Sequence, residues 1–216
     1  PNKKIRIGYY SNEFYSHVTS LFFKTLLKHH DRERYQIYCY SNSIKQDEVT
    51  AHLQKNSDFW RDVSKIKPSK IAQKVRADNI DIFVGTTNFL ASNRIVLAHQ
   101  PAPIIVSYMN QVSTTGLSKV DYVIVDDRIS PVGIGDDFFT EKVIRLNDFI
   151  CYCPPGKEVV VKPAPLIANG YITFGCFNNL AKLNQRVISK WSNILKSVPN
   201  SRMTLSTNGF KDSTLH

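Results

Sequence analysis

The chain has 216 residues, of which 42% are hydrophobic and 21% are charged, a balance that excludes an intrinsically disordered protein. It contains no run of about 18 apolar residues, so the sequence offers no candidate for a membrane-spanning helix. The formal net charge of +10 would suit a phosphate-bearing ligand, an anionic lipid or a nucleic acid. Because the basic residues are dispersed and form no block, the charge alone selects none of these partners.

The cysteines indicate neither a metal site nor a redox motif. Cys39, Cys151, Cys153 and Cys176 include no C-x-x-C pair, and no histidine lies near them at zinc-ligand spacing. We therefore expect reduced, structural cysteines in a cytoplasmic protein that holds no metal. The start at Pro1 lacks an initiator methionine and a signal-peptide pattern, so we interpret the sequence as part of a longer protein.

Short apolar runs in the first 150 residues alternate with helical patterns, which is typical of βαβ units around a mainly parallel sheet. Several runs are nearly continuous in Ile, Val, Tyr and Phe, as expected for strands that are covered on both faces. The predicted strands are residues 5–10, 35–40, 80–84, 104–108, 122–125 and 142–146. The sequence therefore predicts a Rossmann-like α/β domain over residues 1–150.

Four helices are predicted between these strands. A weak pattern follows Asp47, another helix begins at Pro68, and a third covers residues 93–99 before a Pro-Ala-Pro segment. The first helix, over residues 17–30, is expected to pack one face against the sheet. That face contains Val18, Leu21, Phe22 and Leu26.

Residues 151–170 are so rich in proline that we expect a linker without regular structure. The βα pattern then restarts with a strand over residues 171–175, a helix capped by Asn184 and a strand over residues 202–206. The buried face of that helix is expected to contain Val187, Ile188, Trp191, Ile194 and Leu195. Strand, helix and strand are too few for a stable layer, so residues 171–216 are predicted to begin a second Rossmann-like domain and leave it incomplete.

Parallel sheets bind ligands beyond the carboxyl ends of their strands, and polar loops follow several predicted strands here. His17 could take a proton from a substrate hydroxyl, or it could simply begin a helix. Lys182 could stabilise a diphosphate beside a helix N-terminus, or it could be an ordinary solvated lysine. Asp126-Asp127 has the look of an acidic metal pair, but a turn at the end of a strand explains it better.

A series of motifs runs in a fixed order through nearly the whole chain. It includes residues 4–14 with His17, residues 31–35 with 38–41, Trp60-Arg61-Asp62-Val63-Ser64, Pro101-Ala102-Pro103, Thr114-Thr115-Gly116-Leu117 and Phe177-Asn178-Asn179-Leu180-Ala181-Lys182. In this order the motifs resemble the catalytic region of the O-linked N-acetylglucosamine transferase and SPINDLY family. Each piece is weak alone, but together in register they are specific.

The resemblance implies a two-domain GT-B fold, UDP-N-acetylglucosamine as donor and Ser or Thr hydroxyls of proteins as acceptors. It also implies inversion without a metal or other cofactor, and upstream tetratricopeptide repeats that present the acceptor. By matching motif positions, it assigns catalytic roles to His17 and Asp78. It assigns substrate binding to Asn179, Lys182, Thr114 and Thr115.

Some family positions differ in this chain. Asn88-Phe89-Leu90 stands where a Gly-His-Thr-like element is usual, Asn110-Gln111-Val112 replaces Gly-Tyr-Pro, and Gln100 replaces an arginine. Because these positions line the family's cleft, an alternative is a diverged, inactive homologue that binds a nucleotide or a protein. A basic nucleic-acid-binding module is a third alternative, although the chain has no RNP-like, helix-turn-helix or zinc signature.

Overall fold

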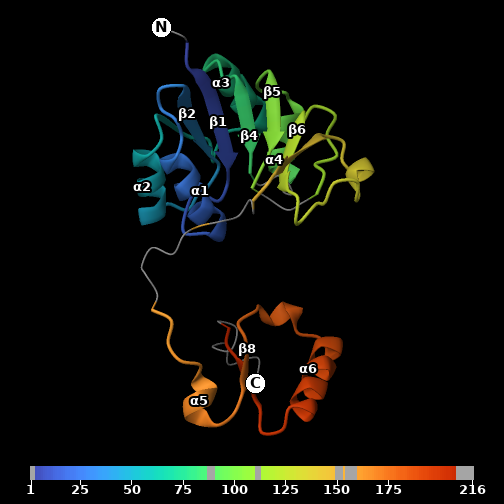
Figure 1. Cartoon of the computed structure of the whole chain (residues 1–216). Helices are drawn as coiled ribbons and strands as arrows, with labels where there is room; N and C mark the ends of the chain where they lie inside the picture. The colour runs from blue at the N-terminus through green and yellow to red at the C-terminus, as the bar shows by residue number, and fades with distance from the viewer. Residues whose placement is uncertain (1–2, 87–90, 110–112, 149–152, 154–159, 208–216) are drawn as a thin grey trace. The chain divides into compact units, whose positions relative to one another are not determined.

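The computed structural model describes residues 3–86, 91–109, 113–148, 153 and 160–207 (Figure 1). The chain divides into two compact units, Pro1–Pro154 and Pro155–His216. The boundary between them lies inside the proline-rich stretch 151–170. Among the described helices, none has the length and apolar character needed to cross a membrane.

The first unit is built on a seven-stranded sheet in which every neighbouring pair is parallel. Its strand order is β3-β2-β1-β4-β5-β6-β7, so β1 lies inside the sheet with β2 on one side and β4 on the other. The strands are β1 (Ile5–Ser11), β2 (Tyr35–Ser41), β3 (Phe59–Asp62), β4 (Ile82–Gly85), β5 (Ile104–Ser107), β6 (Tyr122–Asp126) and β7 (Lys142–Leu146). All six predicted strands of this unit are confirmed, and β3 is an additional strand that the sequence reading missed.

Helices cover both faces of this sheet, as the apolar strands require (Figure 1). α1 (Val18–Lys28) and α2 (Glu48–Lys55) share one core cluster, which includes Phe23, Leu27 and Leu53. α3 (Pro68–Ala77) and α4 (Ala91–Ala98) share the other, and a short 3-10 helix, η1 (Asp136–Phe138), lies between β6 and β7.

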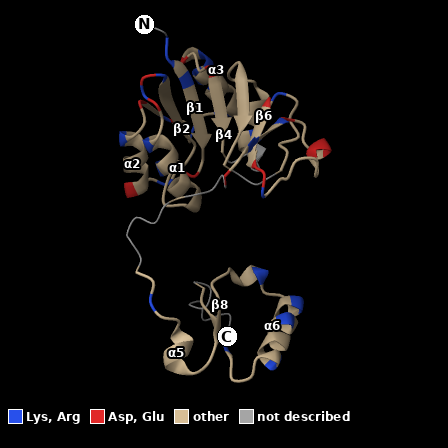
Figure 2. Cartoon of the chain, in the orientation of Figure 1, with Lys and Arg blue, Asp and Glu red and all other residues tan. Residues whose placement is uncertain are grey.

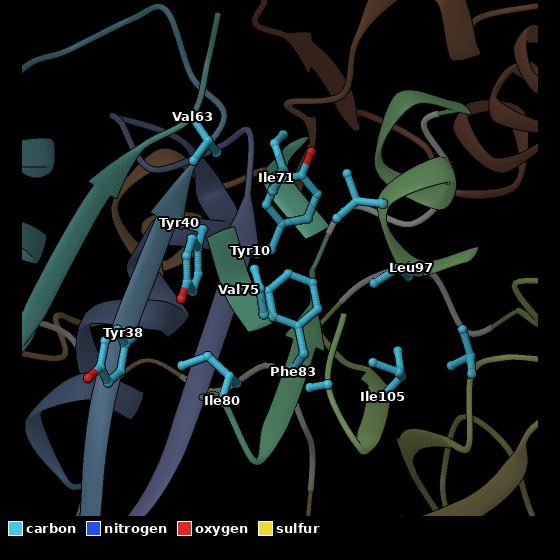
Figure 3. Packing of buried hydrophobic residues seen from close by; sticks show 13 residues of the cluster. Tyr10, Tyr38, Tyr40, Val63, Ile71, Val75, Ile80, Phe83, Leu97 and Ile105 are labelled. Atoms are coloured by element: carbon cyan, nitrogen blue, oxygen red, sulfur yellow. The ribbon is translucent and has the colours of Figure 1, made fainter. Parts of the chain in front are cut away.

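Successive side chains of β1 point to opposite faces of the sheet, so β1 contributes residues to both core clusters. Tyr9 points into the cluster beneath α1, and Tyr10 points into the cluster on the α3 and α4 side. Figure 3 shows Tyr10 and Phe83 lying close together in the second cluster, with ring centroids 5.8 Å apart. Gly8 allows this packing, because a Cβ there would lie 3.0 Å from the ring of Tyr40 and 3.1 Å from Phe83.

The predicted buried face of the first helix is confirmed for Phe22 and Leu26, which pack against the core cluster, and is wrong for Val18 and Leu21. Val18 and Leu21 are 57% and 48% exposed, whereas Phe23 and Leu27 are fully buried. Phe23 packs edge-on against Tyr9, with ring centroids 4.9 Å apart, so the four-residue spacing of Phe23 and Leu27 directs the helix. The chain offered two overlapping apolar stripes at helical spacing, and the aromatic one is buried.

The missed strand β3 is an edge strand of four residues that are all partly or fully exposed. It pairs with β2 through Tyr38 and Phe59, whose rings stack at 4.4 Å. A single exposed face gives an edge strand no continuous apolar run, so its sequence carries a weak strand signal.

The second unit contains α5 (Pro165–Asn169), β8 (Thr173–Cys176), the 3-10 helix η2 (Leu180–Lys182), α6 (Gln185–Ser197) and β9 (Arg202–Leu205). Its two strands form a separate parallel sheet. The expectation of no regular structure in residues 151–170 is wrong at α5, which Pro165 begins. Proline suits the first turn of a helix, where its missing N–H has no helical partner anyway.

The cap of α6 is confirmed, because the Asn184 side chain accepts a hydrogen bond from the Val187 N–H at 3.1 Å. The expected buried face of this helix is not buried. Ile188 and Ile194 are 47% and 42% exposed, and none of the described residues of the second unit is buried. A two-stranded sheet and one long helix remove too little apolar surface from water to form a core.

Gly8→Ala tests the close packing around β1. The added methyl group meets three core side chains from separate elements, so we expect it to lower the free energy of unfolding by about 1–3 kcal/mol. Urea denaturation measures the loss. The matched control is Glu33→Ala at an exposed position, for which we expect a change within about 0.5 kcal/mol. Equal stability of the two variants would contradict the packing described here.

Candidate functional site

The strand order places a topological switch point between β1 and β4 at the carboxyl edge of the first unit. The helices that follow these two strands, α1 and α4, cover opposite faces of the sheet, and in open parallel sheets such a point forms a crevice. The segment after β1 leads to His17 and α1, and the segment after β4 leads to α4. This switch point is where an open parallel sheet ordinarily binds its ligand.

Side-chain amides connect the segments around the switch point. Asn42, after β2, donates to the Tyr10 hydroxyl at 3.0 Å and to Asn93 Oδ1 at 3.4 Å. Asn93, on α4, donates in turn to Asn12 Oδ1, after β1, at 3.3 Å. Burial raises the pKa of Tyr10, and the bond from Asn42 offsets this only in part, so the hydroxyl stays protonated. The network joins three polar segments at the carboxyl edge of the sheet.

Sequence reasoning did not identify this amide network. Asn12, Asn42 and Asn93 are separated by about 30 to 50 residues, so no local spacing relates them. The one available signal is that each asparagine directly follows a strand or begins a helix at the carboxyl edge.

His17 begins α1 as its N-cap, and its Nδ1 lies 3.3 Å from the Thr19 N–H, the local hydrogen bond expected of a helix start. The Glu13 carboxylate also lies 3.4 Å from Nδ1. The two contacts require different tautomers, because Thr19 needs a lone pair on Nδ1 and Glu13 needs a proton there. The tautomer that bonds Glu13 leaves the Nε2 lone pair available to take a proton. Glu13 was missing from the predicted site.

A pocket of about 280 Å³ opens beside His17. Ser16 and His17 form its polar part, and Val18, Leu21 and Val49 supply apolar walls. The exposure of Val18 and Leu21, which contradicts the predicted helix face, therefore places apolar surface directly next to the imidazole.

Asp78 lies away from this crevice. It ends α3 on one face of the sheet and precedes β4, whereas His17 begins α1 on the opposite face. Its carboxylate accepts hydrogen bonds from the Tyr40 hydroxyl at 2.7 Å and from Arg61 at 3.1 and 3.3 Å. Burial alone would raise the pKa of Asp78, but these bonds outweigh burial and hold the pKa below its usual value. The structure does not bring Asp78 and His17 together, and a catalytic role of Asp78 stays a prediction.

Thr114 and Thr115 meet on one buried carboxylate, that of Glu141, which sequence reasoning had not selected. Thr115 donates to Glu141 Oε1 through both its hydroxyl and its N–H, the latter at 2.7 Å. The Thr114 hydroxyl donates to Oε2 at 2.8 Å. Burial would raise the pKa of Glu141, but the hydrogen bonds from both threonines outweigh burial and lower it. Both hydroxyls bond to Glu141 and hold the loop in place, and a role of Thr114 and Thr115 in substrate binding stays a prediction.

The acidic pair Asp126-Asp127 forms a turn, as the simpler interpretation expected. Asp126 Oδ1 accepts hydrogen bonds from the N–H groups of Arg128 and Ile129 at 3.0 and 2.8 Å. Across the described residues, no group of three or more His, Cys, Asp or Glu side chains is arranged to hold a metal ion. The expectation of a metal-independent site stays a prediction.

In the second unit, Asn179 precedes the 3-10 helix η2 and Lys182 is its last residue. Asn179 caps it by accepting from the Ala181 N–H at 2.9 Å, and the Lys182 ammonium donates to Asn178 Oδ1 at 3.3 Å. Residues 160–207 contain six Lys and Arg and no Asp or Glu. Figure 2 shows this positive charge on α6 and near η2. The arrangement fits an anionic ligand.

Two of the three departures from the family pattern, residues 88–90 and 110–112, lie outside the described residues. The third, Gln100, has a left-handed backbone with φ of 47° and follows α4. A left-handed conformation is uncommon for a residue with a side chain, and it lets the chain reverse sharply before Pro101.

Comparison with known proteins decides the family. The model of the family described as "Glycosyl transferase family 41" matches residues 1–151. The chain belongs to glycosyl transferase family 41. The match spans the whole seven-stranded sheet and the loops that hold His17, Thr114 and Glu141.

Curated relatives of this family 41 chain include plant proteins named probable UDP-N-acetylglucosamine–peptide N-acetylglucosaminyltransferase SPINDLY. The Arabidopsis thaliana protein is 39% identical over 216 residues, which cover 97% of this chain and 24% of the relative. The Solanum lycopersicum protein is 36% identical over 215 residues, covering 97% and 23%. The chain thus spans about a quarter of the length of the curated relatives it matches.

The solved structure of a lysine-to-methionine variant of the Thermobaculum terrenum O-GlcNAc transferase is similar, with a TM-score of 0.88 and 34% sequence identity. The similarity covers 98% of this chain and 40% of that chain. The family 41 chain therefore has the α/β fold of GT-B type that the sequence predicted.

Glu141→Gln tests the carboxylate that holds the Thr114–Thr115 loop. The amide loses the charge and one acceptor oxygen, so we expect the free energy of unfolding to fall by about 1.5–3 kcal/mol at pH 7. Because the folded-state pKa of Glu141 is lowered, its stabilisation is present above the unfolded-state pKa and is lost as the pH falls through the folded one.

The stability difference between parent and Glu141→Gln should therefore shrink as urea titrations are repeated from about pH 7 to about pH 3. Thr115→Ser, which keeps the hydroxyl, is the matched control and should retain most of the stability. A difference between parent and Glu141→Gln that stays constant over this range contradicts the assigned ionisation.

Proposed function

We propose that this chain supplies part of a protein O-glycosyltransferase. The enzyme transfers N-acetylglucosamine from UDP-N-acetylglucosamine to Ser and Thr hydroxyls of proteins, with inversion at the anomeric carbon. The observation that carries the proposal is His17 at the switch point of a family 41 sheet, with the Glu13 carboxylate 3.4 Å from its Nδ1. The curated relatives' names state the same donor and a peptide acceptor.

His17 has the chemistry needed on the acceptor side. With its Nδ1 proton directed at Glu13, its Nε2 can take the proton from an acceptor hydroxyl as that oxygen attacks the sugar. The imidazolium that forms then lies beside a carboxylate, which stabilises it. The asparagines at the carboxyl edge supply further donors and acceptors for the polypeptide or the sugar.

Lys182 and Asn179 are proposed to bind the donor. As the sugar departs, negative charge grows on the diphosphate, and a lysine near the start of α6 can stabilise it without a metal. The excess of basic over acidic residues in 160–207 adds a favourable field. Thr114 and Thr115 contribute by holding their loop through Glu141.

Three further features belong to the proposal for the whole protein. These are tetratricopeptide repeats upstream that present the acceptor, a cytoplasmic location and catalysis without a metal or other cofactor. A second candidate function is that of an inactive homologue that binds a nucleotide or a protein, and the replacement of the usual arginine by Gln100 favours it.

Lys182→Ala tests the donor site in the full-length protein. We expect the affinity for UDP, measured by titration calorimetry, to fall about 10- to 150-fold because a charged hydrogen-bond donor is lost. Lys190→Ala, which removes an exposed lysine from the middle of α6, is the matched control and should change the affinity little. Equal effects of the two variants would exclude a specific contact, and a parent protein that binds no UDP supports an inactive homologue that binds a protein.

His17→Asn tests the proposed proton transfer separately from the role of His17 as the N-cap of α1. Asparagine is a preferred N-cap, so α1 should keep its start while the imidazole is lost. We expect kcat for transfer to an acceptor peptide to fall about 100-fold or more, with unchanged unfolding in urea. His52→Asn, at an exposed position on α2, should retain parental turnover. Full turnover by His17→Asn means that another group takes the proton.

A further inference from the structure

Arg94 carries a positive charge that the described structure leaves uncompensated. Its Nε is buried and has no hydrogen-bond acceptor within the described part of the chain. None of the ion pairs formed by the described residues involves Arg94. Burying a donor of a charged group without an acceptor is costly, so a built-in arginine of this kind indicates an absent anionic partner.

Glu141, the carboxylate bound to the loop of residues 113–117, does not supply that partner. Arg94 Nη2 lies 3.5 Å from the position that a Cβ on Gly116 would occupy, so the guanidinium lies against the 113–117 loop. Glu141 is bound to the same loop, but its two oxygens accept from Thr114 and Thr115 instead. The two threonines thus donate to both oxygens of Glu141, and the Arg94 guanidinium can pair with an anion from outside the unit.

The position of Arg94 favours an anion at the carboxyl edge. Arg94 lies in the first turn of α4, where the helix dipole adds positive potential and the first turn contains no acidic residue. Its neighbour Asn93 is bonded to Asn12, on the segment that leads from β1 to His17. Arg94 and His17 therefore belong to the same edge of the same unit.

We propose that Arg94 binds a carboxylate side chain of the acceptor polypeptide. This inference rests on the proposed function, in which His17 receives the acceptor hydroxyl at this edge. A planar guanidinium suits bidentate binding of a carboxylate, and polypeptides supply carboxylates as Asp and Glu. The donor's diphosphate is the other anion of the reaction, but the cations of residues 160–207 already suit it. Arg94 would thus select acidic acceptor sequences.

The test uses the full-length protein and paired peptides that contain one hydroxyl residue. In each pair an Asp, moved stepwise along the peptide, is compared with Asn at the same position. We expect the parent to prefer one Asp peptide by about 5- to 20-fold in kcat/KM, and Arg94→Gln to bring that ratio close to one. Arg94→Lys should keep part of the preference. Arg128→Gln removes an exposed arginine of the same unit and should leave the ratio unchanged.

When the parent is active, three outcomes overturn the inference. The first is a parent ratio near one at every position, and the second is the parental ratio retained in Arg94→Gln. The third is a rise in KM for UDP-N-acetylglucosamine in Arg94→Gln by the same factor with both peptides of a pair, which would assign the arginine to the diphosphate. If the parent transfers sugar to no peptide, the proposed function fails, and fluorescence anisotropy of the same labelled peptides decides the inference. Arg94-dependent preference for the Asp peptide then supports it, and equal or absent binding overturns it.

Discussion

The first unit depends on the pairing of β1 with β2 on one side and β4 on the other. This pairing fixes two things at once. It places Gly8 between the side chains of Tyr40 and Phe83, so that the core on the α3 and α4 side closes over the centre of the sheet. It also makes the connections from β1 and β4 diverge, which opens the crevice at the carboxyl edge. The same strand pairing therefore determines both the core on the α3 and α4 side and the candidate site at the carboxyl edge.

Much of the sheet was predictable because its central parallel strands are nearly continuous apolar runs, and all six predicted strands formed, including the partly exposed edge strand β7. The helix faces were less predictable. In α1 the chain offers Val18 and Leu21 beside Phe23 and Leu27, and only tertiary packing against Tyr9 selects the second pair. The edge strand β3 was not predicted, because burial on one side only leaves a weak hydrophobic pattern in the sequence.

The candidate site was predictable where local sequence determines it, and unpredictable where distant segments meet. The N-cap at His17 and the cap at Asn184 follow from residue type and position. Glu141 lies 26 residues from Thr115 in sequence, and no pattern in the chain relates them. Asp78 was selected through a resemblance, whereas its structural partners, Tyr40 and Arg61, come from β2 and β3. Which carboxylate is structural and which is available to a substrate depends on such long-range contacts.

The internal position of β1 also has a consequence for synthesis of the chain. Translation delivers β1 and β2 before β4, which begins only at Ile82, so one edge of β1 lacks its partner while the 70 residues between Ser11 and Ile82 are added. An unpaired edge of a hydrophobic strand readily joins another chain. The nascent polypeptide therefore passes through a stage at which Gly8 and Tyr10 lack their cover from Phe83. During that interval the unpaired edge is prone to aggregation, so shielding on the ribosome or by a chaperone would protect the nascent chain.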